Sequence, residues 1–180
     1  MGVVNTKSTE ISNSDALPKV PNTNLTQGGM LREDVATLEV ATTDTNTSTY
    51  RFVRLPSSAR ISNILIAHDA ISGFADGSIG VYYPAVGAPP GVTAGAVVDA
   101  DCFNGTTATD FTTARRQWAD LTHEVTAGSG GFDVDEVRKK LWEIAGLSAD
   151  PGCNLDIVIT GNDVTTNGGG TISMLVRWVA

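Results

Sequence analysis

The side chains best suited to catalysis or metal binding are sparse in this sequence and form no known motif. His68 and His123 are the only histidines, and each is followed directly by an acid, Asp69 and Glu124. Adjacent residues of a strand point to opposite faces, so this adjacency does not predict a shared site. A zinc site needs two or three convergent ligands, and the chain has neither an HExxH motif nor a Cys/His cluster. We therefore expect no metal site.

Two pairs of carboxylates have spacings that could suit acid-base chemistry or calcium binding. Asp99 and Asp101 share a face if their strand is regular, and such a pair could serve a glycosidase or bind calcium. Asp133 and Asp135 lie at a predicted helix start, where the helix dipole explains them better. Neither pair has a recognisable partner, and the chain has no GxSxG motif. The sequence thus predicts no catalytic, cofactor-binding or metal-binding residue, and we expect the protein not to be an enzyme.

Tryptophan and cysteine residues offer two further possibilities. Trp118, Trp142 and Trp178 could line a sugar site, but Trp178 lies on the inward stripe of a terminal strand, and we expect core packing for all three. Cys102 and Cys153 are far apart in sequence and lack CxxC spacing. We expect small buried thiols, while a disulfide between them stays open at this stage.

Composition narrows the choice of partners. Twenty acidic residues against twelve basic ones give a net charge of −8, which should repel phosphate backbones, so we expect no nucleic-acid partner. Arg51, Arg54 and Arg60 come nearest to a basic patch and are interpreted as solvated strand edges and ends. No apolar run approaches the roughly twenty residues that cross a bilayer. The first residues lack a signal-peptide pattern, so we expect a soluble protein made in the cytosol, without a membrane partner.

The hydrophobic pattern after residue 30 is mainly that of short strands. Strand-like segments lie at 35–40, 50–55, 60–67, 77–83, 96–103, 155–159 and 171–180. The first two are predicted to form a hairpin, and so are the last two. The 60–67 segment has apolar residues on both faces, which favours a central strand. Residues 112–120 are ambiguous between a helix and a strand.

One helix is predicted to begin at Asp133. Asp133 would be its N-cap, Glu136 would complete a capping box, and Phe132 with Val137 would form a hydrophobic staple. The inward stripe would then include Leu141 and run on to a C-cap glycine.

The segment 84–95 combines prolines and glycines that neither a helix nor a strand sustains. It is predicted to be an exposed surface loop and a candidate contact surface.

Residues 1–30 differ from the rest because they are polar and show no sustained period. We predict two parts: an extended polar N-terminal arm, 1–30, and a β-sandwich body, 31–180. Isolated apolar residues of the arm could dock on a neighbouring subunit: Val3, Val4, Ile11, Leu17, Val20 and Leu25. The predicted fold class is all-β, an antiparallel β-sandwich of jelly-roll or Greek-key type with one short helix.

The body also resembles a known family. The resemblance covers about residues 30–180 and rests on the segments 50–67, 80–83, 97–103 and 141–151. These segments are similar to those of a family of small tailed-bacteriophage virion proteins described as structural proteins. The pattern is an overall one, without a catalytic motif.

The resemblance implies a non-enzymatic virion protein, most naturally a head decoration or cement protein that stabilises the major capsid shell. Its partners would be the major capsid protein and copies of itself as a homo-oligomer, and its location the phage head after synthesis in the host cytoplasm. Two alternatives stay open. One is a tail or head-tail joining component. The other is a carbohydrate-binding β-sandwich module, which would require Trp118, Tyr82 and Tyr83 to be exposed.

Overall fold

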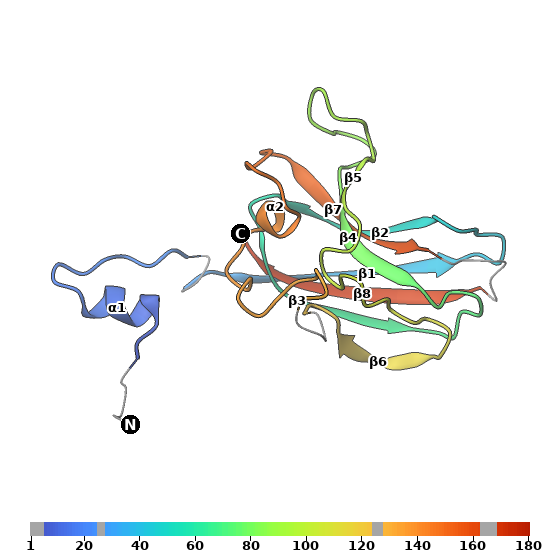
Figure 1. Cartoon of the computed structure of the whole chain (residues 1–180), viewed down its shortest axis with the longest axis horizontal. Coiled ribbons are helices and arrows are strands. Elements are labelled where there is room, and N and C mark those ends of the chain that lie inside the picture. The colour runs from blue at the N-terminus through green and yellow to red at the C-terminus, as the bar shows by residue number, and fades with distance from the viewer. Residues whose placement is uncertain (1–5, 25–27, 124–127, 163–168) are drawn as a thin grey trace.

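The chain folds into two four-stranded antiparallel sheets packed face to face (Figure 1). This structure is a computed structural model, and it describes residues 6–24, 28–123, 128–162 and 169–180. The first sheet has the order β1 (Leu31–Val40), β8 (Gly170–Val179), β3 (Arg60–His68) and β6 (Arg115–Asp120). The second has the order β2 (Thr49–Pro56), β7 (Asn154–Gly161), β4 (Gly77–Tyr82) and β5 (Val97–Asp99).

The strand order is that of an eight-stranded jelly roll. Successive strands alternate between the two sheets except for β4 and β5, which are neighbours in the second sheet. All paired strands are antiparallel. An antiparallel double sheet of eight strands with this crossing pattern is a jelly roll. The predicted all-β sandwich is therefore confirmed.

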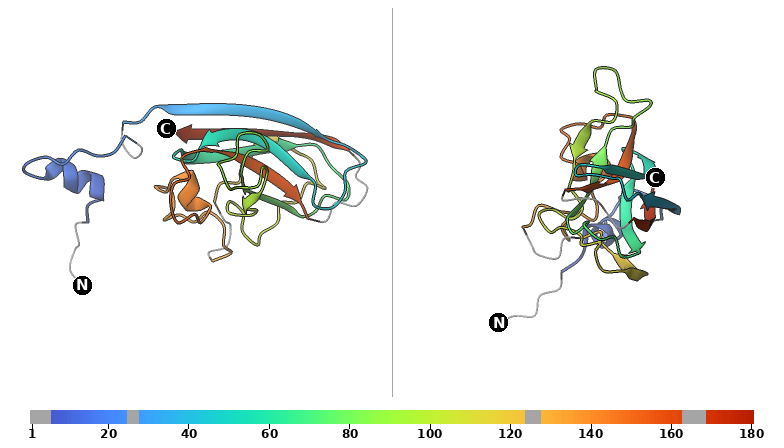
Figure 2. Two further views of the ribbon diagram at one scale, coloured as in Figure 1. Left: turned by 90° about the horizontal axis from the view of Figure 1, so that it is seen from above. Right: turned by 90° about the vertical axis from the view of Figure 1, so that its right-hand side faces the viewer.

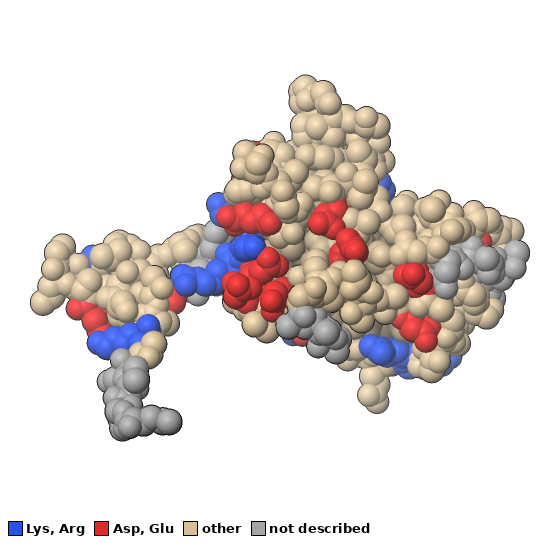
Figure 3. Space-filling view, in the orientation of Figure 1, with Lys and Arg blue, Asp and Glu red and all other residues tan. Residues whose placement is uncertain are grey.

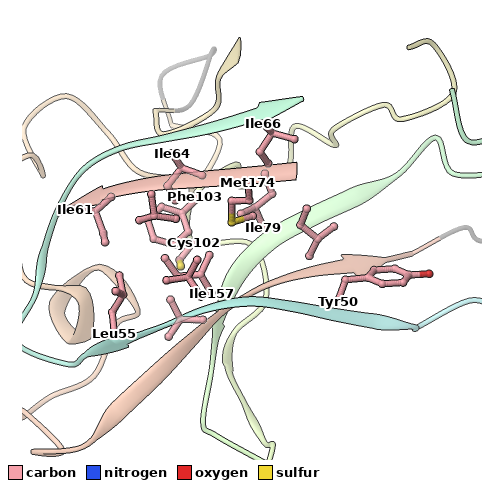
Figure 4. Packing of buried hydrophobic residues seen from close by; sticks show 14 of the residues in the cluster. Tyr50, Leu55, Ile61, Ile64, Ile66, Ile79, Cys102, Phe103, Ile157 and Met174 are labelled. Carbon is pink, nitrogen blue, oxygen red and sulfur yellow. The ribbon is translucent and has the colours of Figure 1, made fainter. Parts of the chain in front are cut away.

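The core lies between the sheets, where the period-two pattern of each strand places its apolar residues. Ile172, Met174, Val176 and Trp178 of β8 are at most 6% exposed, as the alternation predicted. Side chains from the two sheets point toward one another in this layer (Figure 4). Each buried Ile or Leu contributes ~1.5–3 kcal/mol relative to an exposed one, so this layer dominates the stability of the body.

Strand β3 occupies the interior position that the sequence predicted, but its isoleucines are not divided between two faces as regular alternation requires. Regular alternation would put Ile61 on the opposite face of the strand from Ile64 and Ile66. The pairing with β8 shifts between Ile61 and Asn63, so that Ser62 is an extra residue. This bulge turns Ile61 to the core, and all three isoleucines are fully buried.

Both predicted hairpins are wrong. The predicted strand 35–40 is part of β1, which pairs with β8, whereas β2 pairs with β7 in the other sheet. In the same way β7 and β8 lie in different sheets. Each connection crosses from one sheet to the other, and local alternation cannot distinguish such a crossing from a hairpin.

Two other expectations about strands are resolved by burial and pairing. The segment 112–120 forms β6, a strand and not a helix, which pairs with β3 at the edge of its sheet. The predicted strand at 155–159 lies within β7, which is buried on both faces from Leu155 to Gly161.

The predicted helix start at Asp133 is wrong, because helix α2 covers only Leu141–Ile144. The Glu136 carboxylate does accept the Asp133 N–H at 3.3 Å, but the segment continues as turns. In a longer helix the N–H groups of Leu141 and Trp142 would bond to carbonyls four residues earlier. They donate instead to the Ala59 and Ser57 carbonyls, at 2.7 and 3.1 Å. These long-range hydrogen bonds use the two N–H groups that a helix beginning at Asp133 would need for its own backbone hydrogen bonds.

The described part of the predicted arm includes a short helix, α1 (Thr9–Asp15), which the sequence pattern did not suggest. Ser8 caps it, since its Oγ accepts the Ile11 N–H at 3.3 Å. The helix lies beyond the end of the sandwich (Figures 1 and 2) and has no buried residue. Of the predicted apolar anchors, Ile11, Leu17 and Val20 are about half or more exposed. The others, Val3, Val4 and Leu25, lie outside the described residues.

Neither described helix has the length and apolar character needed to cross a membrane.

Candidate functional site

Each of the two histidine rings packs against a phenylalanine. His68 is buried, with Nδ1 2.8 Å from the Asp69 carbonyl oxygen, and its ring meets Phe111 edge-on. His123 stacks on Phe132, with ring centroids 4.9 Å apart. Glu124 lies outside the described residues. Within the described ranges, no three His, Cys, Asp or Glu side chains come together as metal ligands would.

The two carboxylate pairs differ in whether the structure matches their predicted placement. Asp99 and Asp101 do lie together at the end of β5, where the Asp101 N–H donates to Asp99 Oδ1 at 3.1 Å. Burial, and then the neighbouring Asp99 carboxyl group, raises the pKa of Asp101. Asp133 and Asp135 lie in turns before α2, so the helix-dipole interpretation of that pair is wrong. In the described part of the chain, neither pair is joined by a third His, Cys, Asp or Glu side chain that could complete a metal site.

Both cysteines are free thiols. Cys102 is buried in the core and Cys153 is partly buried. Burial raises the pKa of each thiol, and the nearby Asp150 raises that of Cys153 further. A raised pKa keeps a thiol protonated at neutral pH, so neither cysteine is activated as a nucleophile.

The tryptophans follow the core prediction only in part. Trp178 is buried and donates from Nε1 to Asp34 at 2.5 Å, and Trp142 packs against the core. Trp118 is 47% exposed on β6, contrary to expectation. Tyr82 is buried, with its hydroxyl 2.7 Å from Thr160 Oγ1. It cannot form the exposed sugar platform that the carbohydrate-binding alternative requires.

The most distinctive surface feature is the loop 84–96, which projects from the body between β4 and β5 (Figure 1). The sequence predicted that 84–95 would be exposed, and Val86 is 79% exposed. The sequence from Tyr83 to Val98 contains no Asp, Glu, Lys or Arg. The projection is accordingly free of charged side chains in the space-filling view (Figure 3).

The base of this loop is held on both sides by one arginine. Arg51 of β2 donates from Nη1 to the Tyr83 carbonyl and from Nη2 to the Gly95 carbonyl, both at 2.9 Å. The two sides are also joined to each other by backbone hydrogen bonds. The Tyr83 N–H donates to the Ala96 carbonyl at 2.8 Å, and the Gly95 N–H donates to the Pro84 carbonyl at 3.0 Å. We call Arg51 and these paired residues the neck of the loop.

A buried acid supports the neck. Asp156 of β7 is 3% exposed and accepts from Arg51 Nη1 at 3.0 Å. It also accepts from Arg54, through Nε at 2.6 Å and Nη2 at 3.1 Å, a two-bond arrangement that fixes the guanidinium plane. This hydrogen bonding raises the pKa of Arg54. Arg51 and Arg54 are therefore not simply solvated strand ends, as the sequence had suggested.

Sequence reasoning missed this cluster because of a bulge. Residues three apart on a regular strand point to opposite faces. The pairing of β2 with β7 shifts between Arg51 and Val53, so Phe52 is an extra residue and both arginines point to the outer face. The available signal was Asp156, a single acid within the apolar run 155–159. Arg60 lies apart and donates to the Val137 carbonyl at 3.3 Å, and its burial lowers its pKa.

An open cavity of about 550 Å³ lies beside the loop, between residues 84–87 and the turn 150–154. Arg54 and Asp150 contribute charges to its wall. Ser57 Oγ donates to Asp150 Oδ1 at 2.5 Å, and this bond, followed by that from the Gly152 N–H, lowers the pKa of Asp150. Ser57 has no histidine beside it in this wall, so the arrangement is a structural hydrogen bond without a general base.

No protein-family model matches the chain, and no curated protein matches it. It is similar to a chain of the cyanophage Pam1 capsid asymmetric unit, with 14% identity, 99% of each chain covered and a TM-score of 0.39. It is also similar to a chain of the acidic stable capsid of Helicobacter pylori bacteriophage KHP30, with 13% identity, 84% of this chain and 94% of that chain covered, and a TM-score of 0.34. These TM-scores are too low to establish a common fold.

Proposed function

We propose that this chain is a structural protein of a tailed-phage virion, a head decoration or cement protein that binds the major capsid shell and stabilises it. The observation that carries the proposal is the uncharged loop 84–96, which the body presents on a neck built from Arg51 and buried Asp156. A surface of this kind suits protein contact better than chemistry. The resemblance of residues 30–180 to phage structural proteins supports the same role.

The jelly roll supports a role in assembly because it supplies a rigid body, a fold also used by viral capsid domains. The described arm gives a second point of attachment, since Ile11, Leu17 and Val20 have no core of their own to fill. Contacts of modest area become collectively strong when many copies bind one symmetric particle. In this proposal the protein works without a cofactor, as a homo-oligomer on the virion.

Charge supports a position on the outside of the head. With a net charge of −8, the protein is repelled by packaged DNA. The proposal therefore includes the shell and other copies of this chain as partners and excludes nucleic acid and membrane.

Electron microscopy of purified particles tests this function. We expect copies in the hundreds, distributed over the head. A handful of copies at one vertex or on the tail would replace the cement role with a joining or tail role. Absence of the protein from the particles would overturn the proposal.

A further inference from the structure

The loop 84–96 has a composition and a support that suit one mode of binding. We propose that this loop inserts into an uncharged, apolar recess on a different protein, the subunit of the shell, and is the central contact between the two. This inference rests on the proposed function and adds to it the surface used and the chemistry of the receiving site.

The loop has the composition of the centre of a protein interface. Charged residues are depleted at interface cores, because burying an unpaired charge is unfavourable. None occurs over the sixteen residues from Tyr83 to Val98, which include the loop. Val86 in the loop and Val97 at the start of β5 are 79% and 53% exposed. An exposed apolar surface of this kind gains most by entering a recess without charges.

The loop is also ordered before it binds. Arg51 holds both of its sides at the neck, and two turns inside it are closed by hydrogen bonds, from Val92 N–H to Pro89 and from Ala96 N–H to Thr93, both at 3.1 Å. Pro89 and Pro90 restrict the backbone further. A loop that is already in its bound shape loses less conformational entropy on association, which strengthens binding.

The recess belongs to a different protein because the cavities of this chain do not match the loop. Five cavities among the described residues each have charged side chains in their walls. Examples, one from each, are Arg54, Asp156, Arg116, Asp120 and Arg138. An uncharged loop that entered one of them would remove those charges from water without offering a partner, which is unfavourable.

Cysteine labelling tests this inference. Val86→Cys places a thiol at an exposed position of the loop, in a Cys153→Ser background that removes the partly buried native thiol. Val134→Cys is the matched control, because Val134 is 74% exposed on a different segment. We expect alkylation of Val86→Cys to be at least tenfold slower in purified particles than in the free protein, while Val134→Cys changes much less.

A second pair of variants measures binding directly. Val86→Asp should weaken attachment to particles at least tenfold, because it brings a charge into the recess, whereas Val134→Asp should leave attachment nearly unchanged. Circular dichroism and unfolding curves establish that both variants fold.

The outcomes separate the two proposals. Protein present on particles with a freely reactive Val86→Cys, or with undiminished binding of Val86→Asp, overturns the loop inference and leaves the proposed function intact. Protection of Val86→Cys in concentrated free protein overturns the choice of a different protein and indicates a second copy as the receiver. Absence of the protein from particles overturns the proposed function, and the shell as partner with it.

Discussion

The N-terminal arm and the loop 84–96 both extend from the sandwich, but they are attached to it in different ways. Helix α1 of the arm has no buried residue, and its ion pair with the body joins Glu10 to Arg138, two side chains that remain partly exposed. The neck of the loop is held by Arg51, whose partner Asp156 has a side chain only 4% exposed.

The difference teaches how one chain can present two kinds of contact surface. An exposed ion pair contributes about 0–1 kcal/mol, so the arm can leave the body at little cost. Breaking a buried, hydrogen-bonded ion pair costs several times more, so the loop stays in one conformation. We therefore expect the loop to act as a preformed contact and the arm to act as an adaptable one.

The largest effect is expected for Asp156→Ala. It leaves Arg51 and Arg54 without their shared carboxylate and should lower the free energy of unfolding by about 3 kcal/mol. Chemical denaturation measures this, and limited proteolysis should find faster cleavage within 84–96. The matched control is Asp15→Ala, which breaks the exposed Lys7 pair in the arm and should cost no more than about 0.5 kcal/mol. Equal losses in the two variants would remove the distinction drawn between arm and loop.

A smaller effect is expected for Arg51→Lys. Lysine keeps the charge but cannot bridge the Tyr83 and Gly95 carbonyls as the guanidinium does, so unfolding should become easier by about 1–2 kcal/mol. Hydrogen exchange at the neck amides of Tyr83 and Gly95 should accelerate. Unchanged exchange at these amides would mean that the backbone pairing alone holds the neck.

Ser57→Ala should give a pH-dependent effect beside the loop. The Ser57 hydrogen bond lowers the pKa of Asp150 below its ordinary 3.8, so its stabilisation is present above that pH and is lost as the pH falls through the folded-state pKa. The variant loses this hydrogen bond and should be less stable by about 0.5–1 kcal/mol at pH 7. The loss is small because the Asp150 carboxylate is exposed and its charge is screened by water. Unfolding curves from pH 7 to pH 2 measure the difference, which should shrink at the acid end. A difference that stays constant over this range would assign the effect to packing of Ser57.

The smallest effect is expected from removing residues 2–28. The arm adds no buried residue in its helix, so the body should unfold within about 0.5 kcal/mol of the full chain when both are monomeric. Attachment to particles should weaken at the same time. A markedly lower unfolding temperature for the truncated body would show that the arm is an integral part of the sandwich.

Local patterns determined the features that depend on local physics. The alternation of Ile172, Met174, Val176 and Trp178 fixed which side of the last strand is buried, since side chains of a strand point alternately to its two faces. The prolines and glycines of 84–95 predicted an exposed loop, because such a backbone cannot complete a ladder. The sandwich class followed from many short strands separated by turns.

The features that depend on distant partners could be decided only by the tertiary structure. Bulges at Ser62 and Phe52 exist because β3 and β2 pair with β8 and β7, and they set which face Ile61, Arg51 and Arg54 occupy. The start of α2 at Leu141 depends on carbonyls more than eighty residues earlier in the chain, at Ser57 and Ala59. A one-residue shift in pairing moves every side chain beyond it to the opposite face of the sheet. The residues near each bulge do not identify the partner strand that imposes the shift.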